Sequence, residues 1–225
     1  MAFFKNQLSI ALHRYFEGQK PVRFELEDIK VERHPSKGHP RGWDAFRLRF
    51  ALRDNHLAGT RSLPTLEIEV AAPETLGPEA VEIMNIRGFS ARVYSLHRIA
   101  GEKLRAYLTS LPAYRQKMRG GHREFRIKDL HDVARILRTR SATDADFWIN
   151  AGDEFRLACE SRFVDCEGLY TFMQGWPLAR ERYEADPSLR SVPFVEAEQA
   201  LTTVAGLFKN RGIFPLNFPV DKPLR

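Results

Sequence analysis

The sequence predicts an α+β fold, with a sheet in the first part of the chain and helices in the rest. Two observations carry this prediction. Between residues 22 and 71 apolar residues alternate with charged ones, which is the period of a half-buried strand. From about residue 95 onward, apolar residues recur at spacings of three and four, which is typical of amphipathic helices. We therefore expect a partial sheet domain over residues 1–92 and a helical domain over residues 93–225.

Composition narrows the class of protein. The chain has 225 residues, 43% of them hydrophobic, which is enough to bury a core and excludes general disorder. No stretch of about 18 residues is free of charge, so no membrane partner is expected. Cys159 and Cys166 form neither a disulfide framework nor a zinc motif, and the first residues do not resemble a secretory signal. We expect a cytoplasmic protein in a reducing compartment.

The first part of the chain contains one helical and three strand patterns. Residues 6–17 have helical spacing, and Gly18 ends the pattern. Alternating patterns then predict three strands, over residues 22–33, 44–52 and 64–71. Consecutive strands with short connections favour an antiparallel or mixed sheet.

The second part of the chain is predicted to be helical. A stripe of apolar residues begins after Ser95, whose hydroxyl suits an N-cap. Further helical patterns cover residues 128–138, 144–160, 165–184 and 194–209, with breaks at Gly175, Pro177 and Pro187. The ending around Phe214 and Phe218 is expected to be extended and held in place by these rings.

Two glutamates share one face of the predicted strand at residues 66–70. Glu67 and Glu69 are two positions apart, so their carboxylates lie on the same side and repel each other unless a metal, a base or open water separates them. A solvent-facing edge strand explains the pattern. A Mg²⁺ ligand also explains it, but a Mg²⁺ site needs further oxygen ligands.

Two helices carry charged residues that suit phosphate chemistry. Lys103 lies beside the apolar stripe of its helix, where it can extend to solvent or meet a phosphate in a cleft. Asp129 and Asp132 share a face near the start of another helix. Negative charge is stabilising there, so a structural role and a role in orienting a nearby cation both fit.

Basic residues gather between residues 115 and 128, where Glu124 is the sole acidic residue. A solvated loop and a nucleic-acid-binding surface both fit this pattern. In the second case the phosphate contacts come from Arg115, Lys117, Arg119, Arg123 and Arg126. Walker, GxGxxG, GxSxG and HExxH motifs do not occur in the sequence, which excludes the commonest nucleotide-fold and hydrolase assignments.

The order of these segments resembles a known family. The acidic strand is followed by Val93-Tyr94-Ser95-Leu96, then by Gly101-Glu102-Lys103-Leu104-Arg105-Ala106, and then by Arg126-Ile127-Lys128-Asp129-Leu130-His131-Asp132. This succession, over roughly residues 60–140, resembles the AbiEii/AbiGii family. That family consists of nucleotidyltransferase-like toxins of bacterial type IV toxin–antitoxin and abortive-infection systems.

The resemblance implies a DNA polymerase β-like nucleotidyltransferase core with a mixed sheet, followed by a helical C-terminal domain. It implies a nucleoside triphosphate and Mg²⁺ as ligands, an RNA acceptor such as a tRNA end, and a cognate antitoxin. It also implies that Glu69 is the third metal-binding carboxylate and catalytic, and that Lys103 contacts the triphosphate. Asp129 corresponds to the catalytic aspartate of the family's "RD" motif.

One part of the family signature is missing from the front of the chain. The signature begins with a Gly-Gly or Gly-Ser turn and an Asp-x-Asp strand, whereas Asp28 and Asp44 each stand alone here. We expect either a gene start placed too late or a degenerate relative, and little or no nucleotidyl transfer by this chain in both cases. The alternative function is a non-catalytic protein that binds nucleic acid or an antitoxin.

Overall fold

The structure is a computed structural model that describes residues 2–34, 36–37, 44–56, 65–86, 88–115, 117 and 125–220. It confirms the α+β class, with strands before residue 95 and helices after it. The chain divides into two compact units, Met1–Pro73 and Glu74–Arg225. Each unit has its own core and is described separately below.

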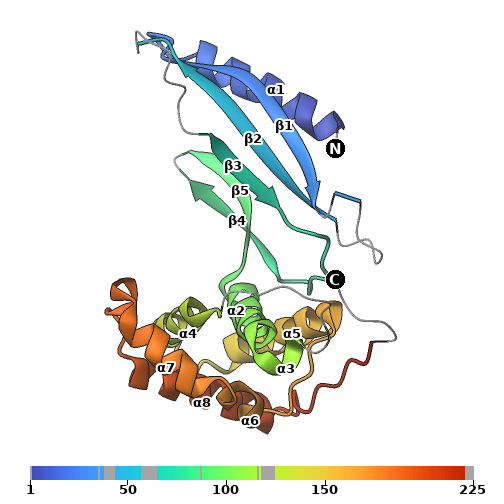
Figure 1. Ribbon diagram of the computed structural model, residues 1–225, viewed down its shortest axis with the longest axis vertical. Coiled ribbons are helices and arrows are strands. Elements are labelled where there is room, and N and C mark those ends of the chain that lie inside the picture. The colour runs from blue at the N-terminus through green and yellow to red at the C-terminus, as the bar shows by residue number, and fades with distance from the viewer. Residues whose placement is uncertain are drawn as a thin grey trace. The chain divides into compact units, whose positions relative to one another are not determined.

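The first unit is a helix packed on a three-stranded sheet. Its elements are α1 (Ala2–Glu17), β1 (Phe24–His34), β2 (Ala45–Asp54) and β3 (Leu66–Val70). The strands pair antiparallel in the order β1-β2-β3, and α1 covers one face (Figure 1). The apolar side of α1 packs on buried sheet residues, namely Leu26, Ile29, Leu48 and Phe50. The helix and the three strands predicted from periodicity are confirmed.

The second unit begins with a hairpin that periodicity did not predict. β4 (Val81–Ile86) and β5 (Phe89–Tyr94) pair antiparallel. The hairpin is short and mostly exposed on both faces, so its apolar residues show no alternation between a buried and a solvent face. The Asn85 side chain accepts a hydrogen bond from the Gly88 N–H, and Gly88 has a φ of +85°, which favours glycine.

Contacts at the base of this hairpin explain where the second unit starts. The Ser95 N–H donates to the Ala80 carbonyl at 2.9 Å, and Glu74 forms an ion pair with Arg98 of the first long helix. The segment before that helix therefore belongs to the helical unit. The two compact units divide between Pro73 and Glu74, whereas residues 92 and 93, where the sheet domain was expected to end, lie inside β5.

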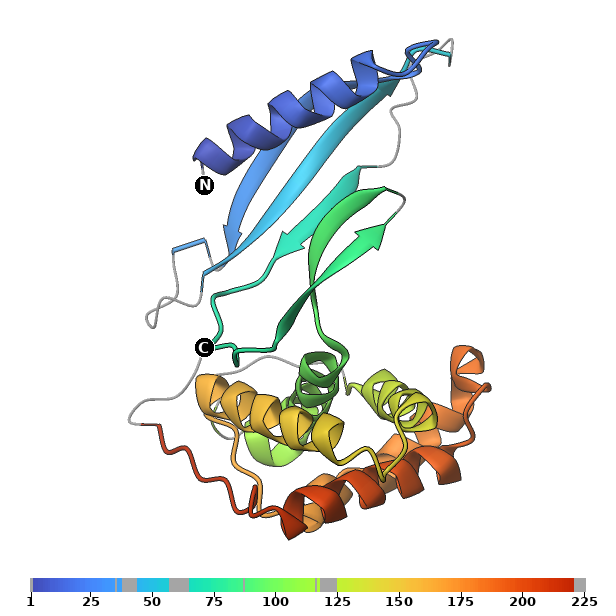
Figure 2. The same cartoon turned by 180° about the vertical axis from the view of Figure 1, so that it is seen from behind.

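The helices of the second unit follow the predicted order. They are α2 (Leu96–Ser110), α3 (Pro112–Arg115), α4 (Ile127–Thr139), α5 (Ala145–Arg162), α6 (Leu169–Met173), α7 (Trp176–Ala185), the 3-10 turn Pro187–Leu189 and α8 (Phe194–Asn210) (Figure 2). Ser95 is the N-cap of α2, as predicted, and accepts a hydrogen bond from the Arg98 N–H. The break expected at Gly175 is confirmed, because it separates α6 from α7, whereas Pro177 lies in the first turn of α7 and does not interrupt that helix.

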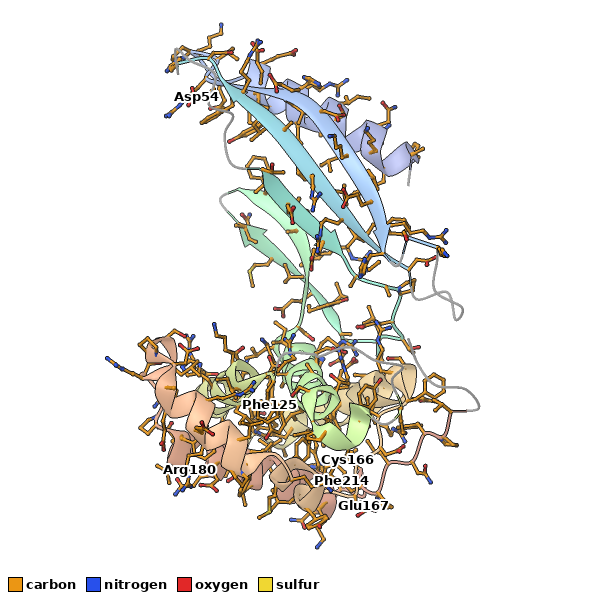
Figure 3. All side chains as sticks on the ribbon, in the orientation of Figure 1. Asp54, Phe125, Cys166, Glu167, Arg180 and Phe214 are labelled. Atoms are coloured by element: carbon orange, nitrogen blue, oxygen red, sulfur yellow. The ribbon has the colours of Figure 1, made fainter. Side chains whose placement is uncertain are left out.

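Close packing of α2 against α5 forms the centre of the second unit. A Cβ added at Gly101 of α2 would lie 2.6 Å from the Phe155 nitrogen of α5, so the two backbones meet where α2 has no side chain. Aromatic rings pack between the helices, and the ring of Phe214, which is labelled in Figure 3, lies 6.0 Å from that of Phe155 and 6.4 Å from that of Phe172, measured between centroids. The C-terminal segment is thus held by a phenylalanine, as expected.

Among the described residues, no helix has the length and hydropathy needed to cross a bilayer.

Candidate functional site

The structure brings Lys103 and Asp129 together, although they come from different helices. The Lys103 ammonium of α2 lies 3.2 Å from Asp129 Oδ1 and 2.6 Å from Asp132 Oδ2, both on α4. Burial by itself would lower the pKa of Lys103, but the hydrogen bond to Asp132 and the charge of Asp129 outweigh it and raise that pKa. The two sequence motifs that carry the family resemblance therefore meet at one point.

Asp129 is the buried centre of this cluster. Its side chain is 2% exposed and lies in the first turn of α4, where the N-terminal end of the helix stabilises a negative charge. Arg126 also binds it, with Nη2 lying 3.3 Å from Asp129 Oδ1. A buried carboxylate between two cations is strongly oriented, so Asp129 fixes the position of Lys103.

A pocket of about 370 Å³ opens beside Lys103. It is lined by Glu102, Lys103, Arg105, Ala106, Thr109, Ser110 and Arg126. Three cations and one carboxylate line it, while Asp129 and Asp132 are not among its lining residues. Such a cavity suits an anion that carries several charges.

The wall of this pocket is anchored by a buried arginine. Arg98 of α2 has no exposed side-chain surface and binds three carboxylates, at 2.8 Å to Glu74, 2.7 Å to Glu102 and 3.0 Å to Glu154. Sequence reasoning missed this cluster, because its carboxylates come from a loop, from α2 and from α5. The sequence signal that could have indicated this cluster is the position of Arg98 within the apolar stripe of its helix.

Glu74 is a carboxylate of this cluster that binds two arginines. It binds Arg98 through one oxygen and Arg162 through the other, the second contact being 2.7 Å. Burial alone would raise the pKa of Glu74, but the hydrogen bond from Arg162 and the charges of three arginines hold it below its usual value. Glu74 therefore stays ionised and links α2 to α5.

Glu67 and Glu69 lie in the first unit, and arginines on β2 separate their charges. The register places Arg47 opposite Glu69 and Arg49 opposite Glu67, and both pairs form hydrogen bonds, at 3.0 and 2.7 Å. The Glu69 side chain is 74% exposed. Cross-strand ion pairs thus explain how two carboxylates share one face.

Nucleotidyltransferases generally use a divalent metal, which several oxygen ligands must hold. Within the described part of the chain, no three His, Cys, Asp or Glu side chains gather in a way that could hold one. An Asp-x-Asp sequence does occur at residues 144–146, but Asp144 is the N-cap of α5 and accepts the Phe147 N–H. The described residues do not fit a metal clamp, so the metal role of Glu69 stays a prediction.

The basic stretch gives a mixed result. The Lys117 ammonium binds Asp165 and the carbonyls of Phe163 and Phe218, at 3.0 and 3.3 Å. Arg126 binds Asp129, as noted above. Arg119, Arg123 and the side chain of Arg115 lie outside the described residues. A nucleic-acid contact by this stretch stays a prediction.

The protein is of the α+β class, and its helical unit has a pocket lined by cations next to a cluster of one lysine and two aspartates. The family model described as "Nucleotidyl transferase AbiEii toxin, Type IV TA system" matches residues 5–205. The chain therefore belongs to the AbiEii family of nucleotidyl transferase toxins, as its segment order had indicated.

The match extends well beyond the resemblance read from the sequence, because it includes α1 before the strands and most of α8. Comparison with curated proteins and with solved structures gave no match. Family membership thus gives the general activity, and the described geometry supports the proposals for particular residues.

Proposed function

We propose that the helical unit binds the phosphate chain of a nucleoside triphosphate at Lys103, and that the nucleotidyl group passes to an RNA acceptor. The observation that carries the proposal is the meeting of Lys103 with Asp129 and Asp132 at the edge of a cationic pocket. An ammonium binds phosphate as a point charge, and a pocket of this charge suits a polyanion.

The chemistry of the cluster gives each residue a role in binding. Lys103 remains charged at neutral pH, because its pKa is raised. Asp129 and Asp132 hold its ammonium from the helix α4 side, which fixes the direction of its long side chain. In this proposal Asp129 is a positioning residue, and the triphosphate is bound by a lysine whose orientation is already set.

The transfer step requires a divalent metal in addition to the phosphate contacts. The described residues offer no clamp for Mg²⁺, so we propose that this chain binds nucleotide and has little transfer activity by itself. A cognate antitoxin follows from the family, in which the toxin is one component of a type IV system, and the RNA acceptor is part of our proposal. A protein that only binds nucleic acid or an antitoxin is the alternative that the test below separates.

Substitution of Lys103 tests nucleotide binding. Lys103→Met keeps much of the side-chain length and removes the charge, so binding of ATP should weaken about ten- to a hundredfold. Isothermal titration measures this change. Lys209→Met, on the last turn of α8, is the matched control and should bind like the unmodified chain.

Transfer is tested with labelled nucleoside triphosphates, Mg²⁺ and total tRNA. The 225-residue chain should label tRNA weakly or not at all, and a version extended upstream with a Gly-Ser and Asp-x-Asp segment should label it. Strong labelling by the unextended chain would contradict the proposed lack of activity. Equal ATP affinity in Lys103→Met and the unmodified chain would contradict the proposed site.

A further inference from the structure

Arg105 also lines the pocket beside Lys103, and the family resemblance assigned it no role. Together with Glu102, Ala106 and Thr109 it follows the spacing of one face of α2, and all four line the cavity. Its side chain is only 15% exposed, so the guanidinium is held at the pocket wall and does not extend freely into solvent. The small side chain of Ala106 leaves the space beside it open.

Arg105 shares its carboxylate partner with a second arginine. Its ion-pair partner among the described residues is Glu102, and the other oxygen of Glu102 binds the buried Arg98 at 2.7 Å. One carboxylate is thus shared between two guanidinium groups. Arg98 has two further carboxylates, Glu74 and Glu154, and among the residues that line the pocket three are cations and one, Glu102, is a carboxylate.

One nitrogen of Arg105 also lacks a partner. Its Nε is buried and has no hydrogen-bond acceptor within the described part of the chain. A buried N–H without an acceptor is unfavourable, and a phosphate in the adjoining pocket would bring oxygen atoms to this side chain. The unmet donor and the cationic lining of the pocket both indicate an anion.

We infer that Arg105 is a second phosphate-binding side chain, which with Lys103 holds the phosphate chain of a nucleoside triphosphate. This inference rests on the proposed nucleotide site and adds a residue to it. Lys103 supplies a point charge held by the aspartates of α4, and Arg105 supplies directed N–H donors held by Glu102, which Arg98 binds in turn. The two cations come from the same helix and line the same pocket.

The test measures binding of inorganic tripolyphosphate and of ATP to the full chain, without added metal, by isothermal titration. Arg105→Gln should weaken the binding of both ligands at least tenfold. The affinity of Arg105→Lys should lie between those of Arg105→Gln and the unmodified chain, because lysine keeps the charge but lacks the planar set of donors. Arg182→Gln, an exposed arginine on α7, is the matched control and should change neither affinity. Loss of ATP binding with tripolyphosphate binding retained would contradict a phosphate contact.

The outcomes separate this inference from the proposed function. If binding is unchanged in Arg105→Gln but lost in Lys103→Met, the inference about Arg105 is overturned and the proposed site at Lys103 stands. Loss in Arg105→Gln with unchanged binding in Lys103→Met supports Arg105 and overturns the role of Lys103. Failure of the unmodified chain to bind either ligand overturns both.

A chemical probe of the unmodified chain decides the question if Arg105→Gln does not fold. Phenylglyoxal modifies arginine, and mass spectrometry follows each arginine separately. Tripolyphosphate should slow modification of Arg105 at least severalfold and leave Arg182 unaffected. Equal rates at Arg105 with and without tripolyphosphate would overturn the inference.

Discussion

At the scale of single residues, the buried Arg98 is the feature that most constrains this chain. Its guanidinium is out of contact with water and binds carboxylates from three segments. A buried charge is tolerated only when it is paired. Removing one partner leaves the other charges buried without a counter-charge, which is strongly destabilising. Arg98 therefore ties α2 to α5 and to the segment around Glu74 in the second unit.

Arg98→Leu should destabilise the protein by about 3–5 kcal/mol, because Glu154 loses its arginine partner while it stays buried. Urea unfolding followed by circular dichroism measures this cost. Arg156→Leu, at an exposed position of α5, should change stability by less than about 0.5 kcal/mol. Equal costs at the two positions would show that the Arg98 cluster does not contribute as described.

At the scale of elements, the crossing of α2 and α5 depends on the absence of a side chain at Gly101. The nearest atoms to an added Cβ are backbone atoms of α5, at 2.6 Å from the Phe155 nitrogen and 3.0 Å from the Glu154 carbonyl carbon. Backbone atoms cannot move aside without separating the helices. Helix propensity would favour alanine at this position, so packing determines the residue.

Gly101→Ala should therefore destabilise the protein by about 1–3 kcal/mol through overpacking, despite the better helix propensity of alanine. Gly206→Ala is the matched change in α8, where nothing lies within 4 Å of an added Cβ. That variant should be neutral or more stable by up to about 1 kcal/mol. Thermal unfolding of both variants gives the comparison, and a stabilised Gly101→Ala would contradict the close crossing.

At the scale of the whole molecule, acid should destabilise the second unit through Glu74. The pKa of Glu74 is lowered in the folded state, so at acidic pH the unfolded chain binds a proton more readily than the folded one. Stability from this group is then present above the unfolded value near 4.5 and is lost as the pH falls through the folded value. The ion pairs of this cluster join Glu74, α2 and α5. Their loss therefore lowers the stability of the whole second unit.

Glu74→Gln tests this linkage. The variant should have a lower thermal midpoint than the unmodified chain at pH 7, and the difference should shrink as the pH falls below about 4.5. Thermal scans between pH 7 and pH 3 measure it. Glu181→Gln, at an exposed position of α7, is the control, and a Glu74→Gln difference that stays constant with pH would contradict the proposed cause.

The sequence by itself determined the local structure and the family. Alternation and helical spacing predicted β1–β3 and the long helices, because one face of each is buried and the pattern follows from that burial. The hairpin β4–β5 was missed, because both of its faces are largely exposed and no such pattern arises. The motifs around Lys103 and Asp129 are each visible in the sequence, and the order in which they follow the acidic strand indicated the family.

Tertiary structure alone decided which of these residues meet. The pairing of Lys103 with Asp129 and Asp132, the cluster around Arg98 and the pocket beside Arg105 each join segments that are separated in the chain. It also decided that arginines of β2 balance Glu67 and Glu69. Periodicity records whether a side chain is buried but not what it is buried against, so partners become known only when the helices and strands are packed together.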